Sequence, residues 1–163
     1  MAKALALLRS TSLDTIEFVS DIPDDLRVVA NESQLEQAFL NLALNARDAM
    51  PHGGRLSVRA HGIHALPDSV TLPSRPGGYV QIDVEDGGCG MTPEVAARMF
   101  EPFFTTRGSR GSGLGGAVVY GIMSEHHGAI TVATAPGAGT TVSLYLPAPP
   151  LSAAANGDPG GPP

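Results

Sequence analysis

Two glycine-rich runs carry the residues that could do chemistry in this sequence. The first is DGGCGM at residues 86–91, directly after the apolar strand pattern of residues 79–84, and the second is GSGLGG at residues 111–116. Glycines at such junctions allow backbone N–H groups to face an anion or a flat ring, because no Cβ shields them. We interpret the first run as an adenine site, in which the Asp86 carboxylate accepts from the exocyclic amine, and the second as a phosphate site.

Each run also has an alternative explanation. Asp86 can form a turn with its own backbone, as is common in Asp-Gly pairs. The second run matches G-x-G-x-x-G through Gly111, Gly113 and Gly116, but that dinucleotide motif needs a strand just before it and an acid about 20 residues later. A polar loop precedes the run and no acid ends the next strand, so a dinucleotide site is excluded. The sequence contains no G-x-x-x-x-G-K-[ST], which excludes a P-loop.

A helix predicted over residues 31–50 supplies the candidate metal ligands. Asn41, Asn45 and Asp48 share a stripe beside its apolar face, and Arg47 points to nearly the opposite side, where we expect an exposed charge. Amide oxygens in such a stripe can ligate Mg²⁺ together with phosphate oxygens and water. For either asparagine alone, a hydrogen bond at a helix end or between strands is the alternative.

The elements around these motifs alternate between strands and helices. Asn31 and Gln34 resemble a capping box at the start of the helix over 31–50. Thr92 and Pro93 begin a second helix that ends near residue 100. A third helix runs from about 114 to 127 and is expected to end at Gly128 in the left-handed conformation. The expected strands are 15–19, 26–29, 54–60, 79–85, 130–133 and 141–146, with an irregular connection at 62–77 and a flexible loop at 105–111.

Size and composition limit the class of protein. The 163 residues suit one domain with a real core, and no apolar run approaches the ~20 residues that span a bilayer. The net charge of −6 argues against a general nucleic-acid binder. A single cysteine, Cys89, excludes an internal disulfide framework. Its side chain is expected to face either the pocket or the core, with a buried, inert thiol as the default.

Five motifs in one order resemble the catalytic, ATP-binding domain of bacterial sensor histidine kinases. They are N-L-x-x-N-A-x-x-A at 41–49, D-x-G-x-G at 86–90, E-P-F-F at 101–104, G-x-G-L-G at 111–115 and G-x-G-T-T at 137–141. The resemblance implies the GHKL (Bergerat) fold, a two-layer α/β sandwich with a mixed sheet of about five strands backed by about three helices and an ATP lid. It places the catalytic domain at residues 14–147. Residues 1–13 then lead in from a dimerisation domain, and residues 148–163 form a Pro/Gly-rich tail or linker.

The resemblance also assigns roles to individual residues. It implies that Asn45 is the Mg²⁺ ligand, that Asn41 lies beside it near the phosphates, and that Asp86 binds the adenine amine. Phe103 and Phe104 would anchor the lid. Arg107 and Arg110 would either pair with the γ-phosphate or remain solvated on a polar loop. The other expected nucleotide contacts are Asp48, Gly88, Gly90, Met91, Phe103, Gly111, Gly113, Leu114, Gly115 and Thr141.

Two positions differ from relatives that hydrolyse ATP or from other kinases. Asn41 stands where hydrolysing relatives typically have an acid, and an amide cannot take a proton from water, which favours transfer to a protein. Gly116 stands where the kinases usually have an apolar residue. We expect it to cost the helix about 1 kcal/mol relative to alanine and to loosen the packing behind the phosphates.

The implied function is transfer of the ATP γ-phosphoryl to a histidine of a separate dimerisation and phosphoacceptor domain, with a response regulator receiver domain as an indirect partner. No histidine precedes residue 14, so we expect this chain not to phosphorylate itself. All five histidines are expected to be structural or exposed (His52, His61, His64, His126, His127). We expect a cytoplasmic location, with no nucleic-acid partner and no membrane contact. The open alternatives are a non-catalytic nucleotide-sensing or docking module of the same fold, or an ATPase or serine kinase of the superfamily.

Overall fold

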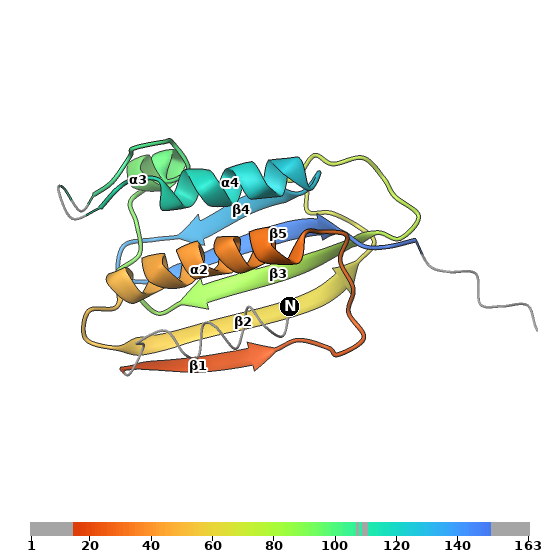
Figure 1. Cartoon of the computed structure of the whole chain (residues 1–163). Helices are drawn as coiled ribbons and strands as arrows, with labels where there is room; N and C mark the ends of the chain where they lie inside the picture. Colours follow the sequence, from red (N-terminus) through yellow and green to blue (C-terminus); the bar gives the residue numbers. More distant parts are fainter. Residues whose placement is uncertain (1–14, 107, 109–110, 151–163) are drawn as a thin grey trace, which may run out of the picture.

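The fold is a single five-stranded sheet covered on one face by helices (Figure 1). The computed structural model describes residues 15–106, 108 and 111–150. The strands lie in the order β1-β2-β3-β5-β4. Their bounds are Ile16–Asp21 (β1), Gly54–Ile63 (β2), Tyr79–Asp86 (β3), Ala129–Thr134 (β4) and Thr140–Pro147 (β5). The helices are Glu32–Ala49 (α2), Pro93–Arg98 (α3) and Gly115–Glu125 (α4).

The sheet is mixed because a helix joins one pair of neighbouring strands. β1 and β2 pair in parallel, since α2 carries the chain back across the sheet between them, and the other three pairs are antiparallel. α2 and α4 lie side by side over the sheet (Figure 1). The predicted two-layer α/β sandwich is therefore confirmed.

The core lies between the helices and one face of the sheet. Alternate residues of each strand point to that face, because successive side chains of a strand lie on opposite sides. They meet the apolar stripe of α2 and the inner side of α4. The largest fully buried residues are Phe39, Leu56, Val58, Val80, Ile82, Val119, Met123, Leu144 and Leu146.

The other face of the sheet is polar. Arg55 Nε donates to Glu17 Oε2 at 3.0 Å, and Ser143 Oγ donates to Asp83 Oδ1 at 2.6 Å. Arg59 forms a second ion pair on this face, with Glu85. Within the described residues, no helix covers this face, which explains why its side chains are charged or hydroxylated (Figure 1).

The start of α2 is held by α4 as well as by its own cap. Asn31 Oδ1 accepts from the backbone N–H of Ser33 at 3.0 Å and of Gln34 at 3.3 Å, so the predicted N-cap is confirmed. The other bond of the predicted capping box, from the Asn31 N–H to the Gln34 side chain, is wrong, because both groups bond to residues at the end of α4. Gln34 Nε2 donates to Glu125 Oε2 at 2.7 Å, and the Asn31 N–H donates to His126 Nε2 at 2.9 Å.

The end of α4 is a Schellman motif in which His127, with φ +53°, takes the left-handed conformation. The N–H of His127 donates to Ser124 O at 3.1 Å, and that of Gly128 donates to Met123 O at 2.8 Å. The prediction that Gly128 is the left-handed residue is therefore wrong. Gly128 is needed because a Cβ there would lie 2.4 Å from the carbonyl oxygen of Tyr145.

Most of the expected elements are present, and one is not. No strand forms at residues 26–29, which carry the chain from the edge strand β1 to the start of α2. The segment makes one backbone bond to the sheet, from Val29 N–H to Pro147 O at 2.8 Å. The expected helix at residues 1–12 and the tail from residue 151 lie outside the described residues. None of the helices in the described part of the chain is long and apolar enough to cross a bilayer.

Candidate functional site

A cavity of about 420 Å³ lies at one end of the sandwich. Its wall is built by the second half of α2, the end of β3 and the loop after it, α3, the segment that leads into α4, and the start of β5. This volume falls within the range of small-molecule sites. The predicted residues that the cavity brings together are Asn41, Asn45, Asp48, Asp86, Gly90, Met91, Gly111, Gly113 and Gly115.

Four predicted residues lie outside this wall, and two others are not described. Gly88, Phe103, Leu114 and Thr141 do not line the cavity. Arg107 and Arg110 lie outside the described residues, so their two alternatives stay open. Thr141 points to the polar face of the sheet, because successive residues of a strand face opposite sides. Its neighbour Thr140 is buried and lines the cavity instead.

Asp86 ends β3 on the side that faces the helices. Its Oδ1 accepts from the N–H of Gly88 at 2.9 Å, which is the turn that Asp-Gly pairs favour. Burial raises the pKa of Asp86 above its ordinary value of 3.8. The N–H groups of Gly88 and Thr140 oppose that shift, and the nearby Glu85 adds to it. The carboxylate both makes the turn and lines the cavity, so the two interpretations of Asp86 are compatible.

The first glycine run packs three stretches of backbone together. The Cys89 N–H donates to Ala49 O at 3.0 Å, and the Cys89 carbonyl accepts from Gly137 N–H at 2.7 Å. Gly90 has φ +64°, and a Cβ there would lie 1.9 Å from Ala135 O. The glycines thus allow the loop to dock between the end of α2 and the β4–β5 turn.

The N–H groups of this run are therefore largely occupied. Gly87 N–H donates to Arg55 O at 3.1 Å, and Met91 N–H donates to Thr134 Oγ1 at 3.0 Å. Gly88 and Cys89 donate to Asp86 and Ala49 as described above. The prediction that this run leaves its N–H groups facing a ligand is wrong for these four residues, which leaves the Asp86 carboxylate as the candidate binding group on this side of the cavity.

The second run brings the start of α4 to the cavity. No side chain caps this helix at Leu114, and its first intrahelical bond joins Val118 N–H to Leu114 O at 2.9 Å. Uncapped N–H groups and the positive end of the helix dipole suit phosphate oxygens. Gly115 lies against α2, because its Cβ would be 3.2 Å from Asn41 Oδ1.

Gly116 is tightly packed. It is buried, and a Cβ there would lie 2.0 Å from the carbonyl oxygen of Met99. The prediction that Gly116 loosens the packing is therefore wrong. The residue is small because the segment after α3 passes too close for any side chain.

The polar stripe of α2 faces the second run. Asn41 Nδ2 donates to Gln37 O at 2.9 Å, which leaves its amide oxygen toward Gly115. Asn41, Asn45 and Asp48 offer the hard oxygen donors that Mg²⁺ prefers. Within the described part of the chain, no group of three His, Cys, Asp or Glu could hold a metal by itself.

Sequence reasoning missed Arg47 as a residue of the cavity. Its side chain is 43% exposed, which agrees with the expected exposed charge, yet it lines the cavity wall. Its Nε and Nη2 donate to Asp48 Oδ1 at 3.0 and 2.9 Å. The long side chain reaches both Asp48 and the cavity wall, whereas the helical wheel gives only the direction of the Cβ atom.

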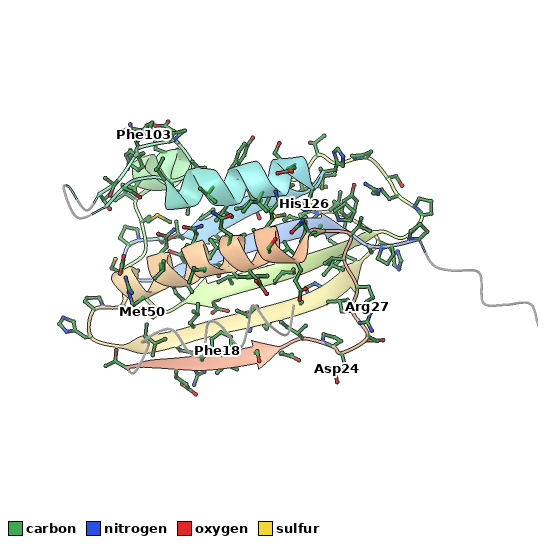
Figure 2. All side chains as sticks on the ribbon, in the orientation of Figure 1. Phe18, Asp24, Arg27, Met50, Phe103 and His126 are labelled. Carbon is green, nitrogen blue, oxygen red and sulfur yellow. The ribbon has the colours of Figure 1, made fainter. Side chains whose placement is uncertain are left out.

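The two phenylalanines before the loop have different positions. Phe103 has φ +65° and is 75% exposed, and Figure 2 shows it at the margin of the molecule beside α3. Its backbone N–H donates to Gly113 O at 2.9 Å, so its main chain holds the base of the loop. Phe104 lines the cavity, and its ring centroid lies 4.2 Å from the guanidinium carbon of Arg98.

The cysteine and the histidines complete the site predictions. Cys89 is exposed and lines the cavity, so the expected burial is wrong. It sits at the tip of a loop that packs through its backbone, which leaves the side chain outside the core. His52, His61, His64 and His127 are exposed and His126 is a structural bridge, as expected.

Comparisons with known proteins agree with this geometry. Residues 30–150 match the family described as histidine kinase-, DNA gyrase B- and HSP90-like ATPases. The chain is 44% identical over 124 residues to the sensor kinase CckA of Brucella abortus, covering 74% of this chain and 13% of the relative. It is 36% identical over 137 residues to sporulation kinase E of Bacillus subtilis, covering 83% of this chain and 17% of the relative. The chain thus spans a small part of these relatives.

Solved structures show the same fold. The mycobacterial sensor histidine kinase MprB is 30% identical, with a TM-score of 0.73 and coverage of 92% of this chain and 93% of that one. Full-length ShkA in complex with AMPPNP is 28% identical, with a TM-score of 0.69 and coverage of 92% of this chain and 30% of that one.

Proposed function

Because the chain belongs to the family of histidine kinase-, DNA gyrase B- and HSP90-like ATPases, as the ATP-binding catalytic domain of a sensor histidine kinase, we propose that it binds Mg²⁺-ATP and transfers the γ-phosphoryl to a histidine of another domain. One observation carries the proposal. A carboxylate suited to adenine and an uncapped helix start suited to phosphate line one cavity, with two asparagines between them. The similar kinase ShkA was solved with an ATP analogue, which supports the same ligand here.

The residues of this chain would act mainly by positioning. Asp86 would fix the base, the start of α4 would hold phosphate oxygens, and Asn45 would hold Mg²⁺ with Asn41 beside it. The ion, when bound, neutralises charge on the phosphates. Asn41 cannot act as a general base toward water, so the phosphoryl group is kept for a protein acceptor.

The acceptor would be a histidine of a dimerisation domain, and a response regulator receiver domain would follow it. The catalytic domain would comprise residues 14–147 and work in the cytoplasm, where ATP is available. Two expectations motivated the non-catalytic sensor, loose packing at Gly116 and the lack of an acceptor histidine ahead of residue 14. The Met99 carbonyl fills the position next to Gly116, so the first of these no longer supports the sensor.

Titration calorimetry with Asn45→Ala tests the proposal. We expect wild type to bind ATP more tightly with Mg²⁺ than with EDTA, and the variant to lose that difference, because its metal ligand is gone. Gln37→Ala is the matched control, since it removes an exposed amide from the same helix outside the cavity. Equal Mg²⁺ dependence in Asn45→Ala and wild type would contradict the metal assignment.

Transfer is tested separately with labelled ATP and a purified dimerisation domain from a related kinase. Acid-labile label on that domain supports the histidine kinase. Binding without transfer supports the sensing module, and steady release of phosphate by the chain alone, or acid-stable phosphoserine on a partner, supports the ATPase or serine kinase.

A further inference from the structure

Positive charge is scarce in the wall of the nucleotide cavity. Among the described residues that line it, Arg47 is the only cationic side chain, and Asp48 and Asp86 both carry carboxylates. A nucleoside triphosphate is strongly anionic, and guanidinium groups bind phosphate oxygens through charge-assisted, paired hydrogen bonds. Any fixed cation in this wall is therefore a candidate to hold the phosphate chain.

The geometry of Arg47 leaves room for such a contact. Both of its bonds to Asp48 end on one carboxylate oxygen, Oδ1, at 3.0 and 2.9 Å. A guanidinium has five N–H donors in a fixed fork, so the remaining donors can serve another acceptor. The side chains of the pair are 43% and 28% exposed, and ion pairs exposed to this degree are weak. Arg47 can thus turn toward a ligand without losing a strong interaction.

A second ion pair shows what an ordinary surface pair looks like in this protein. Arg55 donates through Nε to Glu17 Oε2 at 3.0 Å, with exposures of 66% and 60%, on the polar face of the sheet. Arg55 and Glu17 do not line the cavity. The two arginines therefore share their chemistry and differ in location.

We propose that Arg47 binds the phosphate chain of the nucleotide with the N–H donors that its pair with Asp48 does not use. This inference rests on the proposed binding of ATP. Arg47 acts on the phosphates and not on the base, because the base has its own acceptor in Asp86, next to a loop whose N–H groups are occupied.

The test compares Arg47→Gln, Arg47→Lys and Arg55→Gln with two ligands. Binding of the Mg²⁺ complex of a non-hydrolysable ATP analogue is measured by calorimetry, and binding of adenosine by NMR titration. We expect Arg47→Gln to weaken binding of the analogue by about 10- to 100-fold, the range for a hydrogen bond to a charged group, and to leave adenosine binding unchanged. Arg47→Lys should lie between, since it keeps the charge but loses the fork. Arg55→Gln should bind both ligands as wild type does.

Salt gives an independent readout. Affinity for the analogue should fall more steeply with ionic strength in wild type than in Arg47→Gln, because the variant lacks one screened attraction. Unchanged NMR spectra of the free variants show that each is folded.

Three results would overturn the inference. They are wild-type affinity of Arg47→Gln for the analogue, an equal loss of affinity for adenosine, and an equal loss in Arg55→Gln. Failure of the underlying proposal looks different, since wild type itself would then bind neither the analogue nor adenosine.

Discussion

Two glycines of α4 allow a direct measurement of how tightly the cavity is packed where α4 begins. Gly116 is buried, and its Cβ would lie 2.0 Å from Met99 O. Gly121, five residues later, is exposed, with nothing within 4 Å of its Cβ position. Replacing each with alanine adds the same methyl group to the same helix in opposite surroundings.

The expected changes in stability follow from two terms. Alanine is favoured over glycine in a helix by about 1 kcal/mol, and this term acts in the same direction at both positions. Only Gly116→Ala also forces a carbon into a backbone oxygen, and such overpacking costs about 1–3 kcal/mol. We therefore expect Gly121→Ala to be more stable than wild type by up to about 1 kcal/mol, and Gly116→Ala to be less stable than Gly121→Ala by about 1–3 kcal/mol.

Urea unfolding without nucleotide measures this difference, because a bound ligand would add its own stabilisation. The two variants should differ in the urea concentration at the unfolding midpoint. They should share the same dependence of unfolding free energy on urea concentration, which shows that only stability has changed. Titration calorimetry of Gly116→Ala should then show weaker binding of ATP than wild type, since the added methyl group displaces the start of α4. Equal midpoints for the two alanine variants would refute the close approach of Met99 and restore the idea of loose packing.

Two further predictions concern the other end of the cavity and the start of α2. Because the pKa of Asp86 is raised in the folded state, its protonation stabilises the fold at low pH, and that contribution is lost as the pH rises through the raised pKa. Asp86→Asn should therefore have a higher free energy of unfolding than wild type at neutral pH, and this difference should shrink as the pH falls. The variant should also bind ATP about tenfold more weakly or worse, since a neutral acceptor forms a weaker hydrogen bond. The affinity of wild type for ATP should fall as the pH drops toward that pKa, whereas the affinity of the variant should not change with pH. An affinity of wild type that does not change with pH would contradict the role of the carboxylate. Asn31→Ala should lose about 1 kcal/mol in urea unfolding, and Asn31→Asp should keep its stability because it retains the acceptor for Ser33 and Gln34; equal stability of all three proteins would contradict the cap.

Much of the fold could be predicted because each pattern had one dominant cause. The apolar face of α2 recurs at helical spacing because it covers the sheet, and the same spacing placed Asn41, Asn45 and Asp48 together in one wall. The strand that ends at Asp86 alternates because only one of its faces is buried. The segment at 26–29 carried a short apolar pattern too, but its role is to cross the end of the sheet.

What could not be predicted depends on distances between segments far apart in the sequence. A shift of one residue along β5 changes the face of the sheet, which is why Thr140 and not Thr141 lines the cavity. Glycine in a sequence does not reveal whether it faces a ligand or a neighbouring backbone, and here Gly90 and Gly116 face carbonyl oxygens of Ala135 and Met99. The reach of a long side chain such as Arg47 is equally hidden.

The pair of links at the far end of the two long helices has a mechanical consequence. Gln34 is joined to Glu125 at 2.7 Å, and the backbone of Asn31 to His126 at 2.9 Å, while Gly115 rests against Asn41 at the opposite end. These contacts hold α4 against α2 at both of its ends. We therefore expect the two helices to move together when a ligand enters the cavity.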